Sequence, residues 1–190
     1  MDPYISHQLS LVCPYLTGIR KLLDFGCGDL KLGKAIAKNI PALSVTGVDI
    51  IRTNQPKEKN VTFVLSDGKT LPFQKNTFDA VLSYHVLHHC QDPSYILDEL
   101  VRVSKKTIIL VEPVLRLSLE KPGFIFVDIL TNLSRIPNIS FPFSVKHREW
   151  WEREFRRRKL NIRKEKSAGV LPIWLPIGTT ICFVLEKSTE

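Results

Sequence analysis

Short apolar runs alternate with helical patterns along the first 140 residues of the chain. Leu32, Ile36 and Ile40 recur at the spacing of one helix face. A second helix is predicted to begin at Asp92-Pro93, an N-cap residue followed by proline at the first helical position. Strand and helix patterns that alternate predict a parallel sheet covered on both faces. The runs with the length and punctuation of buried strands are 21–25, 43–50, 61–65, 79–84 and 107–111.

The last third of the chain has a different pattern. A long connection, 115–143, contains an apolar segment at 124–133, and a helix rich in Trp and Arg is predicted from Arg148. Two final strands, at 160–166 and 180–187, are separated by a Pro/Gly loop, which favours an antiparallel hairpin.

These patterns together predict the fold class. We expect a single α/β domain over residues 1–190, built on a doubly wound, Rossmann-like sheet. The sheet would have seven strands, mostly parallel, with a C-terminal antiparallel hairpin and helices on both faces.

Composition places the chain among ordinary globular proteins. It has 190 residues, of which 44% are hydrophobic, so it can bury a core without disulfides. Cys13, Cys27, Cys90 and Cys182 are scattered without paired spacing, which predicts reduced thiols in a cytoplasmic protein. The first residues lack a signal-peptide pattern, and prolines break the apolar stretch 169–185, so no membrane span is predicted.

The net charge of +8 comes mainly from one segment. Residues 146–166 contain ten Lys and Arg against four Glu, which is +6, while the remaining 17 basic and 15 acidic residues nearly cancel. We favour a solvated, Arg-rich helix face, because no aromatic–basic interleaving typical of a nucleic-acid groove accompanies the run. The alternative is a surface for an anionic partner, such as nucleic acid, a phospholipid surface or an acidic substrate.

A glycine-rich turn follows the first predicted strand directly. Asp24, Gly26 and Gly28 lie in this turn, and a helix opens behind it. Glycines at such a place let the backbone turn sharply and let a ligand approach the main chain. Asp49 ends the second strand 21 residues after Gly28, where a carboxylate can accept hydrogen bonds from ribose hydroxyls. The two features predict a nucleoside-binding site.

The residues of the turn distinguish between two nucleoside cofactors. A dinucleotide turn has a third glycine where this chain has Lys31, and the chain lacks a Tyr-x-x-x-Lys pair, so an NAD-dependent oxidoreductase is disfavoured. Asp24, before the first glycine, suits a ligand with positive charge. S-adenosylmethionine carries an ammonium and a sulfonium where NAD carries a pyrophosphate, and it is the better match.

Four segments resemble, in order, the motifs of class I S-adenosylmethionine-dependent methyltransferases. The resemblance is clear over residues 21–113 and loose beyond them, and it is closest to the small-molecule branch that includes quinone-biosynthesis enzymes. It implies S-adenosyl-L-methionine as cofactor, S-adenosyl-L-homocysteine as product, and direct displacement onto a small-molecule acceptor. The segments are LLDFGCGDL, VTGVDI, VLSDGKTLPFQKNTFDAVLSYHVLHHCQDP and LDELVRVSKKTIILVEP.

The implied cofactor-binding positions all follow strands of the predicted sheet. Those in the glycine-rich turn would hold the methionine part, and those after the second strand would contact ribose and adenine. The segment after the third strand contains the Asp that would bond the adenine amino group. The positions that end the fourth strand would lie where the methionine end of the cofactor and the acceptor meet. In this order they are Asp24, Gly26, Cys27 and Gly28; Asp49 and Ile50; Ser66, Asp67 and Gly68; and Ser83 and Tyr84.

The chain departs from the family pattern at two places. Leu30 stands where the family usually has a third glycine, and Ser104-Lys105-Lys106 replaces the usual Pro-Gly-Gly turn before the fifth strand. Neither departure strikes a position that contacts the cofactor, so we expect binding to be retained.

Metal-capable side chains cluster after the fourth predicted strand, at His85, His88, His89 and Cys90. Zinc sites usually take ligands from separate segments, and the sequence shows no second cluster, so no metal is expected. Transfer to a hydroxyl needs a proton removed near neutral pH, and His85 is the preferred general base. His88 and His89 are interpreted as the start of a helix.

Residues 115–145 are interpreted as an insertion that covers the acceptor, because methyl transfer needs water excluded and the nucleophile aligned. The expected pocket residues are His85, His88, Arg116 and His147. Displacement at an activated methyl group needs no catalytic nucleophile, so Cys27 is interpreted as a packing residue.

Two other functions stay open. An RNA methyltransferase could use the basic segment 146–166, although Ser83-Tyr84-His85-Val86 stands where base-amine enzymes have Asn/Asp-Pro-Pro-aromatic. A non-catalytic, cofactor-binding partner subunit is the other, since only about twenty residues precede the first strand, where relatives often carry a helical lid. The protein would act as a monomer or a homodimer.

Overall fold

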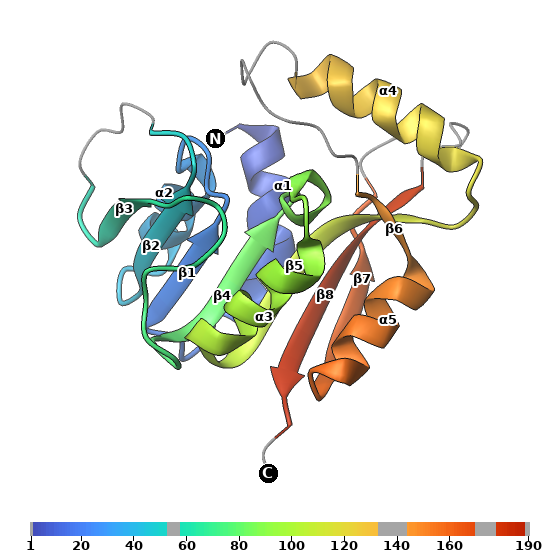
Figure 1. The fold of residues 1–190 in the computed structure, drawn as a ribbon. Helices are drawn as coiled ribbons and strands as arrows, with labels where there is room; N and C mark the ends of the chain where they lie inside the picture. The colour runs from blue at the N-terminus through green and yellow to red at the C-terminus, as the bar shows by residue number, and fades with distance from the viewer. Residues whose placement is uncertain (1, 53–57, 133–143, 170–177, 189–190) are drawn as a thin grey trace.

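One eight-stranded sheet organises the chain (Figure 1). The computed structural model describes residues 2–52, 58–132, 144–169 and 178–188. The strands are β1 (Lys21–Phe25), β2 (Ser44–Asp49), β3 (Val61–Leu65), β4 (Phe78–Tyr84), β5 (Ser104–Leu115), β6 (Lys146–His147), β7 (Leu160–Ser167) and β8 (Thr179–Lys187). All seven predicted strands are therefore confirmed, and β6 is an addition.

The order of the strands is β3-β2-β1-β4-β5-β8-β7, with β6 beside the end of β5. Neighbours from β3 to β5 are parallel, whereas β8 is antiparallel to both β5 and β7. The predicted C-terminal antiparallel hairpin is confirmed, although its connection, 170–177, lies outside the described residues. The chain order reverses between β1 and β4, and ligands of open α/β sheets bind at the carboxyl ends of strands at such a switch point.

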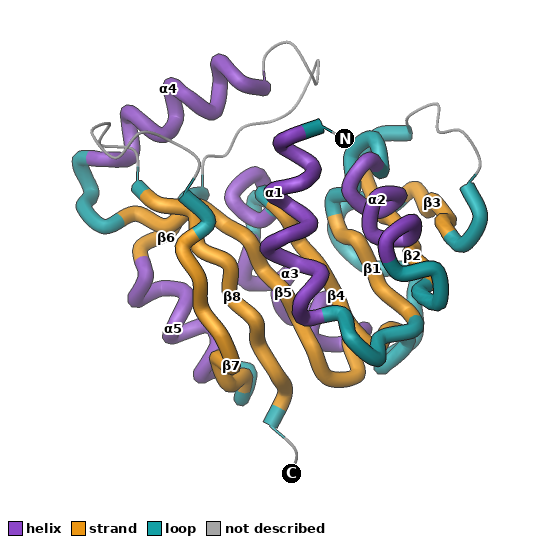
Figure 2. The backbone as a smooth tube through the Cα atoms, turned by 180° about the vertical axis from the view of Figure 1, so that it is seen from behind, coloured by secondary structure: helices purple, strands orange, loops and turns teal. Residues whose placement is uncertain are grey.

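Helices cover both faces of the sheet, as predicted (Figure 1, Figure 2). Side chains of β5 alternate between the faces, as strand geometry requires: Ile108 and Leu110 belong to one core, Ile109 and Val111 to the other. The helices α1 (Pro3–Val12) and α2 (Lys31–Asn39) pack on one face, and α3 (Pro93–Val103) and α5 (Arg148–Arg157) pack on the other.

The predicted helix starts at Asp92-Pro93 and Arg148 are confirmed. The Asp92 carboxylate accepts a hydrogen bond from the Tyr95 amide at 3.0 Å and begins α3. Asp2 begins α1 in the same way through the Tyr4 amide at 2.9 Å, and Pro3 follows it. The helix α1 was not predicted, although Asp2-Pro3 is the same helix-start signal as Asp92-Pro93 of α3.

A further helix, α4 (Glu120–Asn132), contains most of the apolar segment within the predicted insertion. It lies beyond the end of β5, at the carboxyl edge of the parallel strands (Figure 1). Residues 133–143 of the insertion lie outside the described residues. Among the helices that are described, none is both long and apolar enough to cross a membrane.

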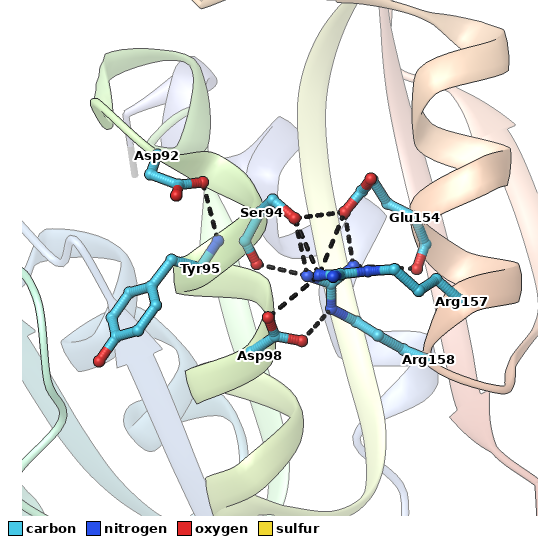
Figure 3. A network of polar contacts seen from close by, with 7 residues as sticks. All are labelled: Asp92, Ser94, Tyr95, Asp98, Glu154, Arg157 and Arg158. Carbon is cyan, nitrogen blue, oxygen red and sulfur yellow. Dashed lines mark hydrogen bonds and ion pairs between the residues drawn. The ribbon is translucent and has the colours of Figure 1, made fainter.

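A network of ion pairs joins α3 to α5 and uses part of the basic segment (Figure 3). Arg158, whose side chain is 4% exposed, contacts Asp98 at 2.8 Å and Glu154 at 2.7 Å. Ser94 donates to Glu154 at 2.5 Å, and its backbone carbonyl accepts a hydrogen bond from Arg158. Arg157 reaches Asp98 at 3.1 Å. These contacts fix α5 against α3.

Replacing Arg158 with alanine is expected to lower the free energy of unfolding by about 2 kcal/mol, because buried Glu154 then loses its nearest cation. Arg156→Ala is the matched control, since that side chain is exposed two positions away and should change stability by less than about 0.5 kcal/mol. Urea denaturation of both variants measures the difference. Equal losses would show that the network does not stabilise the fold.

Candidate functional site

The carboxylate of Asp49 holds the glycine-rich turn against the end of β2. Its Oδ2 accepts the Gly28 amide at 2.8 Å, and its Oδ1 accepts the Ile51 amide at 3.1 Å. The amides of Gly26 and Cys27 donate to the carbonyl of Val48 at 2.8 and 3.1 Å. The turn that follows β1 is therefore fixed directly beside Asp49, as the 21-residue spacing predicted.

Two glycines of the turn adopt the left-handed conformation, with φ of +69° at Gly26 and +50° at Gly28. A Cβ at Gly26 would lie 2.4 Å from the Val86 side chain, so this position has no room for a larger residue. A Cβ at Gly28 would meet no atom of the described residues within 4 Å. The backbone at Gly28 therefore has an open side that a ligand can approach.

Asp24 is a buried acid beneath this turn, with 2% of its surface exposed. Among the described residues, none hydrogen-bonds its Oδ2 atom. Burial, and then the nearby charge of Asp49, raises the pKa of Asp24 to about 7. A cation placed here would stabilise the ionised carboxylate.

Leu30, which stands where the family usually has a third glycine, packs against Gly47 of β2. Leu30 is buried in the left-handed conformation, with φ of +57°. A Cβ on Gly47 would lie 2.1 Å from Leu30 Cδ2 and 2.8 Å from Cys27 Sγ. The two side chains therefore fill the space that Gly47 leaves. Burial, and then the charges of Asp24 and Asp49, keeps the pKa of the Cys27 thiol well above its usual range.

Gly47→Val is expected to destabilise the protein by about 1–3 kcal/mol, because Leu30 and Cys27 must leave the space they occupy. Displacing them moves the glycine-rich turn. Gly169→Ala is a matched control, since among the described residues a Cβ there would meet Ser167 Oγ alone, at an ordinary 3.7 Å. Thermal unfolding of both variants tests this packing, and equal melting temperatures would contradict it.

The loops after β2 and β3 lie against each other. The Ser66 amide donates to the Asp49 carbonyl at 3.0 Å, and Gly68 donates to Ser66 Oγ at 3.3 Å. A Cβ on Gly68 would come within 2.6 Å of Ile50, which is itself 59% exposed. Asp67 accepts the amides of Lys69 and Thr70 at 2.8 and 3.1 Å. The loop that carries Asp67 is thus joined to the end of β2 through the Asp49 carbonyl, and Ile50 lies against this loop.

The end of β4 presents Ser83, Tyr84 and His85. Ser83 is fully buried, and no described residue hydrogen-bonds its hydroxyl. The Tyr84 ring stacks on His85 at 5.0 Å between centroids. His85 has a φ of +56°, which is strained for a residue with a Cβ, and its amide donates to Val111 at 2.8 Å. Burial, and then the charge of His88, lowers the pKa of His85 to about 4.

His88 lies in a 3-10 turn, η2 (Leu87–His89), rather than at the start of a longer helix. It is 2% exposed, and its Nδ1 lies 2.8 Å from Glu112 Oε2. The other oxygen of Glu112 accepts the amides of Val86 and Leu87 at 2.9 and 2.8 Å. Although burial alone would lower it, the carboxylates of Glu112 and Asp128 raise the pKa of His88 to about 9.

Asp128 of α4 completes this cluster. Asp128 Oδ1 lies 3.7 Å from His88 Nε2, and its Oδ2 lies 3.9 Å from His89 Nδ1. Phe124, one turn earlier in α4, contacts His88 edge-on at 5.6 Å between ring centroids. Glu112 and Asp128 were not predicted as site residues, because only the fold brings their segments to the η2 turn.

Arg116 and His147, the other predicted pocket residues, lie together at the end of β5. The register pairs Leu115 with His147. Arg116 is tied to Glu120 at the start of α4 at 2.8 Å, and His147 Nε2 lies 3.3 Å from the Ser118 hydroxyl. The site thus comprises one group around Asp24 and Asp49 and a second group at the ends of β4 and β5, and Gly26 lies against Val86 where the two meet.

Comparisons with known proteins give similarities to methyltransferases. Residues 23–111 match the family described as "Methyltransferase domain". An uncharacterized methyltransferase of Schizosaccharomyces pombe is 36% identical over 106 residues, which are 48% of this chain and 38% of that protein. A ubiquinone/menaquinone biosynthesis C-methyltransferase of Desulfotalea psychrophila is 30% identical over 94 residues, 46% of this chain and 38% of that protein. This chain therefore aligns with less than half the length of either relative.

A solved structure extends the likeness of the fold to nearly the whole chain. A putative methyltransferase from Bacillus halodurans superposes with a TM-score of 0.74 at 16% identity, over 97% of this chain and all of that one. Residues 23–111 therefore match a methyltransferase domain, and the sheet has the fold of that solved structure.

Proposed function

We propose that the protein is an S-adenosylmethionine-dependent methyltransferase that acts on a small-molecule acceptor by direct displacement. The observation that carries the proposal is the glycine-rich turn that Asp49 fixes above Asp24, inside the segment that matches methyltransferase domains. A cytoplasmic location and a monomeric or homodimeric state belong to the same proposal.

The residues of the site fit this cofactor. The Asp24 carboxylate is buried and suits the ammonium, and the open side of Gly28 leaves room for the methionine part. Asp49 suits the ribose hydroxyls, exposed Ile50 suits the adenine face, and Asp67 suits the adenine amino group. When bound, the cofactor supplies a methyl group made electrophilic by the sulfonium.

His85 is proposed as the group that accepts a proton from the acceptor. It is half-buried at the carboxyl end of β4, in a strained backbone conformation of the kind that clusters at functional sites. Its lowered pKa keeps the ring neutral at pH 7, so the ring can accept a proton. His85→Asn should lower kcat by about 100-fold while leaving cofactor binding unchanged. A variant with unaltered kcat would remove this role.

We also propose that residues 115–145 cover the acceptor, with His88, Arg116 and His147 at its margin. The support is the position of α4, whose Asp128 meets the η2 turn directly after β4. Exchanging this segment for that of another methyltransferase should change acceptor preference and leave the affinity for S-adenosylhomocysteine intact. Unchanged preference would contradict the proposal.

Calorimetry with S-adenosylhomocysteine and with NAD tests the cofactor. We expect one equivalent of S-adenosylhomocysteine to bind and NAD to give no saturable signal. Binding of NAD alone would refute the proposed function. Binding of S-adenosylhomocysteine without turnover on any acceptor would favour the alternative of a non-catalytic partner subunit.

Binding should also depend on pH, because the pKa of Asp24 is raised to about 7 and the ammonium favours its ionised form. Affinity for S-adenosylhomocysteine should rise from about pH 5.5 to about pH 7.5 by up to tenfold per unit, then level off. The sign follows because the unbound protein holds a proton that the complex releases. Calorimetry in buffers of different ionisation enthalpy measures this release. Asp24→Asn should abolish the pH dependence.

RNA methylation through the basic segment has less support. Arg157 and Arg158 pair with carboxylates of α3 and α5, and Arg148 pairs with Glu165 at 2.5 Å, so these cations already have anionic partners. Salt-sensitive RNA binding that is lost on mutating Arg156 would favour this function instead.

A further inference from the structure

Two segments that are far apart in sequence bring three potential metal ligands together. His88 and His89 come from the η2 turn, and Asp128 comes from α4. One ligand atom from each lies within 4.8 Å of the other two. Asp128 Oδ1 is 3.7 Å from His88 Nε2, and Asp128 Oδ2 is 3.9 Å from His89 Nδ1. Two ligands of a tetrahedral zinc ion are about 3.4 Å apart, so a small inward movement would close the site.

Glu112 occupies the position of an outer-shell partner in this cluster. Its Oε2 bonds His88 Nδ1 at 2.8 Å, which leaves Nε2 of the same ring facing Asp128. Metal-binding histidines characteristically donate the other ring N–H to a carboxylate, which fixes the ring and its tautomer. Glu112 is itself fixed by the amides of Val86 and Leu87.

The η2 turn is held from a third direction. The Ser144 amide donates to the His88 carbonyl at 2.9 Å, and its hydroxyl contacts the carbonyls of His88 and Cys90 at 3.1 Å each. The two histidines therefore lie on a turn with a fixed backbone, as a metal site requires.

The charges of the cluster suit a divalent cation. Glu112 and Asp128 are 0% and 8% exposed and together carry two negative charges when ionised. A divalent ion that displaces the proton from His88 Nε2 would balance both carboxylates in this buried region.

We propose that His88 Nε2, His89 Nδ1 and the Asp128 carboxylate bind one divalent first-row transition metal ion, with Glu112 orienting His88. Two imidazoles and one carboxylate suit zinc, iron(II), cobalt(II) or manganese(II). They do not suit calcium or magnesium, which take mainly oxygen ligands. Three protein ligands leave at least one position on the ion for water or another ligand.

The metal ion would link α4 to the η2 turn that follows β4. His88 of this turn lies three residues after His85. The ion thus lies beside the place proposed for the acceptor, although its binding does not depend on the proposed function. No metal was predicted from the sequence, because no second segment with a metal ligand was apparent. In the fold, α4 is that segment, and Asp128 is its ligand.

Metal titration of the full chain tests the site. The protein is treated with EDTA, freed of chelator, and titrated by calorimetry with Zn²⁺, Mg²⁺ and Ca²⁺, while Co²⁺ is followed by its visible absorption. We expect one equivalent of Zn²⁺ and of Co²⁺ to bind and no saturable binding of Mg²⁺ or Ca²⁺. No stoichiometric Zn²⁺ or Co²⁺ binding would overturn the proposal.

Three variants locate the metal. His89→Ala and Asp128→Asn should each weaken Zn²⁺ binding by more than about 100-fold, and Glu112→Gln by about tenfold. His147→Ala, which changes a histidine outside the cluster, should bind Zn²⁺ as the original chain does. Circular dichroism checks that each variant is folded, and a ligand variant that fails to fold leaves the other to decide.

The four thiols provide the remaining control, since Cys90 lies close to the cluster. Zn²⁺ binding should persist after alkylation of the cysteines with N-ethylmaleimide. Binding that survives both His89→Ala and Asp128→Asn but is lost on alkylation would assign the ion to the thiols and refute the site.

Discussion

Replacing Asp49 with alanine is expected to weaken binding of S-adenosylhomocysteine by at least about 100-fold, which corresponds to about 2.7 kcal/mol. Asp49 accepts the amides of Gly28 and Ile51, so the variant frees the glycine-rich turn and also removes the proposed ribose ligand. Hydrogen bonds to a charged group contribute about 1.5–3 kcal/mol each, so losing more than one accounts for this magnitude. Calorimetry measures the affinity.

Asp49→Asn separates the two contributions. The amide oxygen can replace one acceptor, so this variant should keep more of the turn's structure while losing the ionised ribose ligand. Glu186→Gln, on β8 away from the turn, is the control and should bind as the original chain does. An Asp49→Ala variant that binds with undiminished affinity would refute the assignment of the site.

Replacing Glu112 with alanine is expected to lower the free energy of unfolding by about 3–5 kcal/mol. Glu112 is fully buried, and it accepts hydrogen bonds from the Val86 and Leu87 amides and from the His88 ring. The substitution leaves these buried donors without an acceptor. Thermal unfolding in EDTA should show a fall in Tm of about 10 °C.

Glu112→Gln should lose less stability than Glu112→Ala, because the amide oxygen can still accept from the two backbone amides. Glu165→Ala is the matched control for removing a paired carboxylate near the surface, and it should cost less than about 1 kcal/mol. If the Glu112 and Glu165 variants unfolded at the same temperature, the buried carboxylate would have no special role in the fold.

The fold was predictable because its elements carry local signals. The apolar runs gave the strands, and the Asp92-Pro93 cap placed α3 at its observed start. β6 was not predictable in this way, because two residues have no period and their pairing with β5 depends on the tertiary register. α1 was missed although Asp2-Pro3 carries the same cap signal as α3.

The sequence predicted those parts of the candidate site whose residues lie close together, or at a fixed spacing, along the chain. The turn from Asp24 to Gly28 follows one strand, and Asp49 stands at a fixed spacing from it, so sequence was sufficient to bring them together. The partners of His88 lie 24 and 40 residues away along the chain, on β5 and α4. No spacing rule connects them, and only the folded sheet places Glu112 and Asp128 at one turn.

The attachment of α4 has a consequence for how this protein changes over evolutionary time. The helix meets the histidine turn through Phe124 and Asp128, while Leu119, Phe126 and Leu130 are exposed. Substitutions of these exposed residues leave both cores of the sheet intact, so selection for folding does not remove them. The region proposed to cover the acceptor can therefore diverge faster than the turn at Asp49, and new acceptor preferences can arise on an unaltered scaffold.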